Sequence, residues 1–130
     1  VVNLLDATPF IPVIAPIGIG EDFKTYNINA DIVAGKIAKI LQAGKYVVLT
    51  NTTGIFDDNG NLIKSMNAEQ VRQLVNKGII SSGMLPKVES ALEAVSAGVQ
   101  NVQIIDGTID HAILLELFTD EGVGTMIRRT

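Results

Sequence analysis

The chain has 130 residues, with 10 Lys and Arg against 14 Asp and Glu, one His and no Cys. This length is typical of a single domain, and a content of 47% hydrophobic residues is enough to form a core, which excludes intrinsic disorder. A net charge of −4 argues against nucleic acid or an anionic membrane as the main partner. The absence of Cys excludes a disulfide framework and a thiol nucleophile. These features predict a cytoplasmic globular protein.

The chain begins without Met at an apolar stretch, residues 1–5, which lacks the charged flank of a signal peptide. We expect this stretch to be the end of a helix that starts elsewhere, and the chain to be part of a longer protein. In chain order, the predicted elements are a strand at 11–15, a loop at 18–22, a helix at 29–44, a strand at 46–50, a hairpin around 59–60, helices at 67–78 and 86–98, a strand at 102–105, a helix at 110–118 and a strand at 124–127.

Local signals support these elements. Asn67 and Gln70 form a capping-box pattern at the start of one helix, and Pro86 occupies the first turn of the next. Asn59 and Gly60 stand between two apolar pairs, which is the strongest short-range signal of a hairpin. Short apolar strands that alternate with helices predict an α/β fold. We expect a three-layer αβα sandwich with a mainly parallel sheet that is covered on both faces.

In sheets of this kind, ligands bind in the loops that follow the carboxyl ends of the strands. This rule selects four segments, at residues 18–31, 50–54, 81–87 and 106–110. In the first segment, Asn29 can cap the following helix and Asp31 can complement the helix dipole. Capping does not require Asn27, so this amide is a candidate ligand for a carboxylate or an amide group.

Residues 81–87 combine two Ser, a Gly and Lys87 at a helix N-terminus, and such a group suits a phosphate. The segment lacks Walker spacing, and a solvated Lys87 in the first helical turn is the simpler interpretation of this segment alone. Gly18 and Gly20 are not followed by a third glycine at dinucleotide-binding spacing. His111 stands alone at a helix start and is better explained as structural than as catalytic. A Ser/His/Asp triad is not predicted, because no nucleophile elbow is present.

Four motifs occur in order along the chain, between residues 11 and 127. They are Ile-Pro-Val-Ile-Ala-Pro at 11–16, Tyr-Asn-Ile-Asn-Ala-Asp at 26–31, Gly-Met-Leu-Pro-Lys-Val at 83–88 and Leu-Glu-Leu-Phe-Thr-Asp-Glu-Gly-Val-Gly-Thr-Met-Ile at 115–127. Together they resemble the acetylglutamate kinases, a family of the amino acid kinase (carbamate kinase-like) superfamily. The resemblance implies that residues 1–130 form a single unit, the ATP-binding C-terminal lobe of that fold. The family's N-terminal half, with its first catalytic lysine, glycine-rich loop and substrate-binding arginine, has no counterpart here.

The resemblance also implies roles for individual residues. Lys87 matches the lysine that stabilises the transition state, and Asp31 matches the aspartate that orients the catalytic lysines. Asn27 matches the acetylglutamate-binding asparagine, and Asn29 lies beside it in the substrate-binding motif. The residues that match the nucleotide-binding segments are Thr50, Asn51, Thr52, Gly54, Ser81, Ser82, Gly83 and Met84. Relatives usually carry Asp where this chain has Asn51, so this loop keeps its hydrogen-bonding capacity but loses a charge.

The implied reaction transfers a phosphoryl group from ATP to the side-chain carboxylate of N-acetyl-L-glutamate. Its products are N-acetyl-L-glutamyl 5-phosphate and ADP, in arginine biosynthesis. Because a carboxylate of pKa about 4.3 is already ionised at neutral pH, the reaction requires no general base. It requires positioning and positive charge on the phosphoryl oxygens, which Lys87, helix N-termini and Mg²⁺ would supply. No metal ligand from the protein is predicted.

The ending at 115–127 resembles that of arginine-inhibited, hexameric members of the family. Glu116 and Gly122 are the candidate ligands of the arginine guanidinium, with His111 as a third, because a carboxylate can form a bidentate pair with a guanidinium. The alternative is that Glu116 is a solvated helix residue and the glycines only shape a turn. The resemblance also implies a homo-oligomer, either dimer or hexamer, and allows a PII-type signal protein as a partner.

Two other functions stay open from the sequence. The chain alone can be a non-catalytic nucleotide-binding fragment, in which case the isolated 130 residues bind ATP without turnover. The parent protein can instead be a kinase of another subfamily, with aspartate, glutamate or uridylate as the acceptor. Asn27 and the ending at 115–127 favour acetylglutamate.

Overall fold

A computed structural model describes residues 10–119 and 122–129 of the chain. The prediction of a helix end at residues 1–5 lies outside this part. In chain order the helices and strands are β1 (Ile17–Ile19), β2 (Thr25–Asn27), α2 (Ala30–Leu41), β3 (Lys45–Thr50), β4 (Ser65–Asn67), α3 (Ala68–Asn76), α4 (Leu85–Ser96), β5 (Asn101–Asp106), α5 (Ala112–Phe118) and β6 (Gly124–Arg128).

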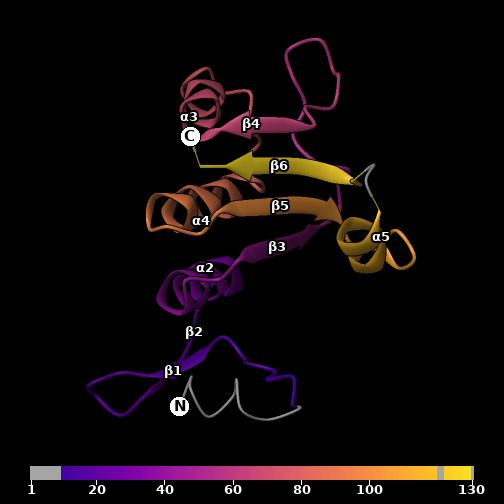
Figure 1. Ribbon diagram of the computed structural model, residues 1–130. Helices are drawn as coiled ribbons and strands as arrows, with labels where there is room; N and C mark the ends of the chain where they lie inside the picture. Colours follow the sequence, from indigo (N-terminus) through magenta and orange to yellow (C-terminus); the bar gives the residue numbers. More distant parts are fainter. Residues whose placement is uncertain (1–9, 120–121, 130) are drawn as a thin grey trace.

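Four strands form the main sheet, in the order β3-β5-β6-β4 (Figure 1). β3 runs parallel to β5, and β4 runs parallel to β6, whereas β5 and β6 are antiparallel. In the β3–β5 register, Thr50 at the end of one strand is paired with Asp106 at the end of the other. The prediction of an α/β fold with a mainly parallel sheet is therefore confirmed.

The two faces of the sheet are covered differently. Helices α2, α3 and α4 pack on one face, where the alternating side chains Tyr46 and Val48 of β3 are buried. Lys45 points to the opposite face, because its ammonium lies 3.8 Å from the carboxylate of Glu116 in α5. Ile105 of β5 is fully buried. The helices thus form layers on both sides of the sheet, with α5 covering the second face around the carboxyl end of β5 (Figure 1).

The predicted buried strand at 11–15 is wrong. Residues 10–15 form no strand, and Ile11 and Val13 are 90% and 96% exposed. The first strand of the described residues is instead β1, which overlaps the predicted loop at 18–22 and pairs antiparallel with β2, apart from the main sheet (Figure 1). The physical reason is that Pro12 and Pro16 lack the backbone N–H that a ladder needs, and none of the described strands pairs with this segment.

The hairpin and the second helix start follow the sequence signals. Phe56 and Leu62 form an antiparallel bridge, and the turn between them is held by the Asp57 carboxylate, which accepts the amides of Asn59 and Asn61 at 2.9 and 2.8 Å. These amides hold the pKa of Asp57 below its ordinary value. The capping box of Asn67 is formed with both hydrogen bonds present. The short strand β4, which directly precedes this box, was not predicted.

Among the helices within residues 10–119 and 122–129, none combines the length and the hydropathy of a bilayer-spanning segment.

Candidate functional site

The candidate site lies where the carboxyl ends of β3 and β5 meet. Thr50 and Asp106 are adjacent there, and the amide of Gly107 donates to the carbonyl of Thr50 at 2.8 Å. The Asp106 carboxylate accepts the hydroxyl and the amide of Thr108 at 2.7 and 2.9 Å, which lowers the pKa of Asp106 below its ordinary value. The strand ends therefore bring together two of the four segments that the sequence rule selected, 50–54 and 106–110. The rule was wrong for the other two, because 81–87 follows a helix, α3, and 18–31 follows no strand of the main sheet.

A cavity of about 330 Å³ opens beside these strand ends. It is lined by Leu49, Thr50, Asn51, Thr52, Ser81, Gly83, Met84 and Lys87. The loop after β3 and the loop before α4 are thus brought to one cavity, and this is large enough for part of a nucleotide. Of the residues that match nucleotide-binding segments, Ser82 and Gly54 do not line this cavity.

A second, smaller cavity of about 210 Å³ shares Thr52, Ser81 and Met84 with the first. Its remaining walls are mainly apolar and come from the hairpin and from the loop after α3. They are Gly54, Ile55, Phe56, Asp57, Ile79 and Ile80. The two cavities together offer a polar compartment with a lysine next to an apolar one. A nucleotide divides chemically in the same way, into phosphates and a base.

Lys87 and Asp31 form an ion pair at the helix starts. The Lys87 ammonium lies 2.9 Å from the Asp31 carboxylate, and each side chain is 20% exposed. Asp31 belongs to the first turn of α2 and Lys87 to the first turn of α4, so the pair links two helices that lie side by side on one face of the sheet. The two residues with predicted catalytic roles are brought together, with Lys87 at the polar cavity.

A buried cluster of two hydroxyl groups lies against the backbone of Asp31. It was not predicted from the sequence. The Ser90 hydroxyl donates to the backbone carbonyl of Asp31 at 2.7 Å and lies 3.1 Å from the Tyr46 hydroxyl. Ser90 and Tyr46 are 5% and 7% exposed, and burial raises the pKa of Tyr46 above its ordinary value. A Ser within an apolar helix stripe is the signal that could have indicated it.

The two predicted substrate-binding amides differ in their surroundings. The Asn29 carboxamide oxygen caps α2 by accepting the amides of Asp31 and Ile32 at 2.9 and 3.4 Å. Capping therefore explains Asn29 fully. Asn27 is exposed at the end of β2, opposite Ile17 of β1. Neither Asn27 nor Asn29 lines either of the two cavities.

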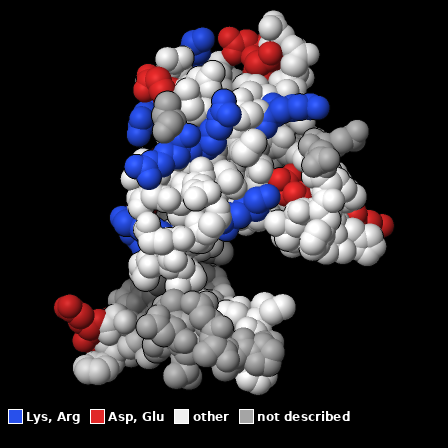
Figure 2. Space-filling model, viewed as in Figure 1, with Lys and Arg blue, Asp and Glu red and all other residues white. Residues whose placement is uncertain are grey.

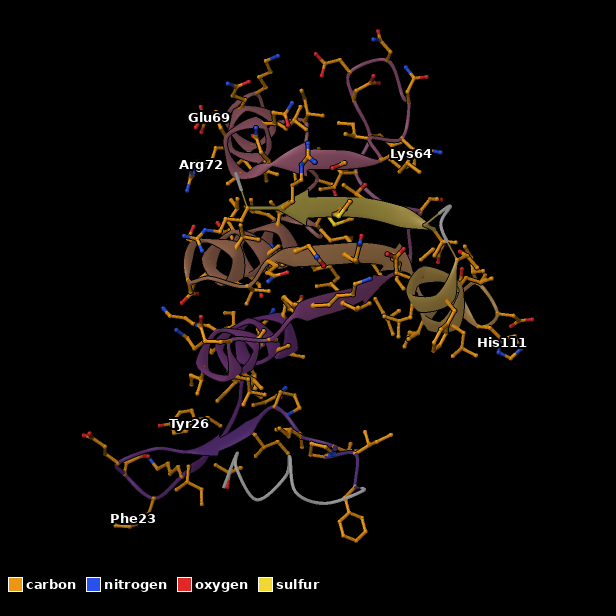
Figure 3. The ribbon with its side chains drawn as sticks, in the orientation of Figure 1. Phe23, Tyr26, Lys64, Glu69, Arg72 and His111 are labelled. Carbon is orange, nitrogen blue, oxygen red and sulfur yellow. The ribbon has the colours of Figure 1, made fainter. Side chains whose placement is uncertain are left out.

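The residues predicted to bind arginine divide into a pair and an outlier. Glu116 is 7% exposed; its carboxylate accepts the Val123 amide at 3.0 Å and faces Lys45. Gly122 lies against this carboxylate in a left-handed conformation with φ of 54°. His111 is exposed at the start of α5 and points away from the sheet (Figure 3). The interpretation of Glu116 as a solvated helix residue is therefore wrong.

The hairpin wall of the apolar cavity is fixed by one threonine of β6. The Thr125 hydroxyl accepts the Ile55 amide at 2.8 Å and donates to the Ile63 carbonyl at 2.7 Å, and Thr125 is fully buried. Gly54 adjoins it with φ of 154°, and a Cβ there would lie 2.6 Å from the Thr125 hydroxyl. Only glycine fits this close approach.

Charge is distributed unevenly over the surface. Lys and Arg side chains form a band across the face shown in Figure 2, although the net charge is −4. The expectation drawn from net charge thus describes the average surface and not each part of it.

Within residues 10–119 and 122–129, no group of three or more His, Cys, Asp or Glu side chains is placed to hold a metal ion.

Sequence and structure comparisons place the chain among known proteins. Acetylglutamate kinase of Nitrosococcus oceani is 59% identical over 128 residues, which are 98% of this chain and 42% of the relative. Acetylglutamate kinase of Nitrosomonas eutropha is 57% identical over 127 residues, which are 98% of this chain and 43% of the relative. The resemblance seen in the sequence motifs is confirmed, and the chain spans less than half the length of these relatives.

A solved relative has the same fold. N-acetylglutamate synthase from Neisseria gonorrhoeae, in complex with coenzyme A and N-acetyl-glutamate, matches with a TM-score of 0.82 and 35% identity over 88% of this chain and 27% of that chain. The same synthase in complex with coenzyme A and L-arginine matches with a TM-score of 0.81. Residues 1–106 match the amino acid kinase family. The chain therefore belongs to the amino acid kinase family.

Proposed function

We propose that the chain is the ATP-binding lobe of an enzyme that phosphorylates the side-chain carboxylate of N-acetyl-L-glutamate, in the cytoplasm, as a step of arginine biosynthesis. The observation that carries this proposal is the Asp31–Lys87 pair at the wall of a polar cavity. Relatives named acetylglutamate kinase, at 57–59% identity across nearly the whole chain, support the choice of acceptor.

The linings of the two cavities suit different parts of ATP. The phosphates would lie in the polar cavity, where the backbone amides before α4 and the Lys87 ammonium meet them. The base would enter the apolar cavity against Phe56, Ile79 and Met84. Asn51, in the lining of the polar cavity, would contribute hydrogen bonds without charge.

The chemistry needed from the chain is electrostatic. The acceptor carboxylate is ionised at neutral pH, so the residues have to orient it and neutralise charge on the transferred group. Lys87 would place its ammonium on the phosphoryl oxygens, and Asp31 would hold that ammonium in one direction. Mg²⁺, which proteins usually bind through substrate phosphates, would neutralise further phosphate charge when present. Asn27 would contact the acceptor.

The isolated chain is expected to bind ATP·Mg²⁺ without turning it over, which isothermal titration calorimetry and an ADP-release assay can measure. Lys87→Met should weaken ATP binding about tenfold, because a charge-assisted hydrogen bond to phosphate is lost. Lys77→Met, which removes the same charge from the end of α3, is the matched control and should leave binding unchanged. Absence of binding would contradict the nucleotide site, and turnover by the chain alone would contradict its being one lobe.

Feedback inhibition by arginine belongs to the same proposal. The buried Glu116 carboxylate beside Gly122 is the ligand for the guanidinium, with His111 as a more distant candidate. The synthase from Neisseria gonorrhoeae, which shares this fold and was solved with L-arginine, supports the presence of an arginine site. The assembled enzyme would be a homo-oligomer, either dimer or hexamer, that a PII-type signal protein could also regulate.

Glu116→Gln is expected to raise the arginine concentration for half-inhibition at least tenfold, while uninhibited turnover stays unchanged. The amide oxygen can still accept the Val123 N–H, but the charge that attracts the guanidinium is gone. The assay uses a chimera in which this chain replaces the matched 128 residues of the Nitrosococcus relative. Glu69→Gln, in the exposed Glu69–Arg72 pair of α3 (Figure 3), is the control. Unchanged inhibition in Glu116→Gln would remove Glu116 from the arginine site.

A further inference from the structure

We propose that Ser90 and Tyr46 are positioning residues, which hold the first turn of α2 against α4 so that Asp31 meets Lys87. The catalytic meaning of this role rests on the proposed function, whereas the contact itself does not. The two partners of the ion pair are 56 residues apart and stand on different helices. Their 2.9 Å contact therefore depends on how α2 and α4 are fixed relative to each other at this end.

Ser90 is placed to fix that relation. It follows Lys87 by three residues, so both side chains lie on the same side of α4. While Lys87 binds the side chain of Asp31, Ser90 donates a hydrogen bond of 2.7 Å to the backbone carbonyl of the same residue. One aspartate is thus held at two points by two consecutive turns of α4, which determines both its position and its direction.

The proton count determines the direction of the remaining bond. The Ser90 hydroxyl has one proton, which the bond to the Asp31 carbonyl uses. At the 3.1 Å contact, the Tyr46 hydroxyl must therefore be the donor to Ser90. The Tyr46 hydroxyl could also donate to the Asp31 carbonyl at 3.4 Å, but its one proton favours the shorter contact with Ser90. Burial keeps the pKa of Tyr46 raised, so its phenol remains protonated and donating at neutral pH.

A glycine in α2 leaves room for the Ser90 side chain. Gly35 is buried in α2, and a Cβ at this position would collide with the Ser90 hydroxyl. The surrounding contact between α2 and α4 is made of small apolar residues, with Ala38, Ala91 and Ala94 buried. A buried hydroxyl in such surroundings costs desolvation unless it is hydrogen-bonded. The hydroxyl of Ser90, one turn from Lys87, therefore supports a positioning role, because an alanine would suffice if the side chain only filled space.

The test is a double-mutant cycle on the 130-residue chain. Asp31→Asn, Lys87→Met and the double variant are unfolded in urea to obtain the coupling between the two charges. We expect a coupling of about tenfold in the unfolding equilibrium constant, as for a partly buried charged hydrogen bond. In a Ser90→Ala background, this coupling should fall below about threefold, and in Tyr46→Phe it should fall to an intermediate value.

Ser96→Ala is the matched control, because it makes the same substitution at an exposed position of α4 and should leave the coupling unchanged. A general loss of stability in Ser90→Ala does not move the coupling, since all four members of the cycle share it. Coupling of full size in Ser90→Ala would overturn the proposal. The coupling is measured without turnover, so it tests only the positioning role. Failure of the kinase assignment would be seen separately, as a chimera without activity.

Discussion

Lys87→Ala in the chimera is expected to lower kcat about 10²–10³-fold, which is the effect of removing one group that stabilises the charge of a transition state. The alanine side chain leaves the polar cavity without its ammonium and leaves the Asp31 carboxylate without its partner. Charge on the transferred phosphoryl group would then be neutralised less completely in the transition state. A coupled assay of ADP release with N-acetyl-L-glutamate as the acceptor measures the change.

Lys36→Ala provides the comparison for this variant. Lys36 is exposed on α2, where its ammonium lies 3.6 Å from Glu93, so its removal should change kcat by less than about twofold. Asp31→Asn should lower kcat less than Lys87→Ala, because the ammonium remains but loses its orientation. A rate in Lys87→Ala that matches that of Lys36→Ala would exclude Lys87 from the mechanism.

Periodicity predicted the parts of the fold that depend on local patterns. The helices and the strands β3, β5 and β6 occur close to their predicted positions. The apolar stripe of α4 is largely buried, whereas α2 and α5 leave large apolar side chains exposed, such as Ile40 at 73% and Phe118 at 79%. The pattern could not predict that β5 and β6 are antiparallel, since strand direction depends on the path of the connecting chain. β4 has three residues, too few for an alternation to be visible.

The segment at 11–15 shows how a local signal fails. Its β-branched residues fit a buried strand, but burial requires a neighbour that covers them. In the described part of the chain no strand pairs with this segment, and Ile11 and Val13 are exposed. Composition states what a residue prefers, whereas contacts with the rest of the protein decide whether that preference is met.

The parts of the site that could be predicted are those whose polar groups lie close together in one segment of the sequence. The loops at 50–54 and 81–87 follow or precede a strand or helix end, and the structure brings both to the same cavity. Ser90 and Tyr46 were not predictable, because their role arises from a contact between residues 44 positions apart. The same holds for Lys45, whose pairing with Glu116 crosses from β3 to α5.

The hairpin wall of the apolar cavity depends on a contact of this long-range kind. Thr125 of β6 satisfies the Ile55 amide and the Ile63 carbonyl with one hydroxyl. Both groups flank the turn whose residues line the cavity, and Ile55 is itself 4% exposed. Gly54 leaves the space that the hydroxyl occupies. Loss of this hydroxyl therefore affects stability and the shape of the apolar cavity together.

Thr125→Val is expected to lower the free energy of unfolding by about 2–4 kcal/mol, because two backbone groups lose their partner and each such loss costs about 1–3 kcal/mol when the group is buried. Urea unfolding measures this as a lower midpoint at an unchanged slope. Thr125→Ser keeps the hydroxyl and loses one methyl group, so it should cost only about 1 kcal/mol. Valine has nearly the shape of threonine and fills the same space, so packing cannot explain a larger loss than that of serine. If the two variants unfold at the same urea concentration, packing of the side chain and not its hydrogen bonds would hold the hairpin to β6.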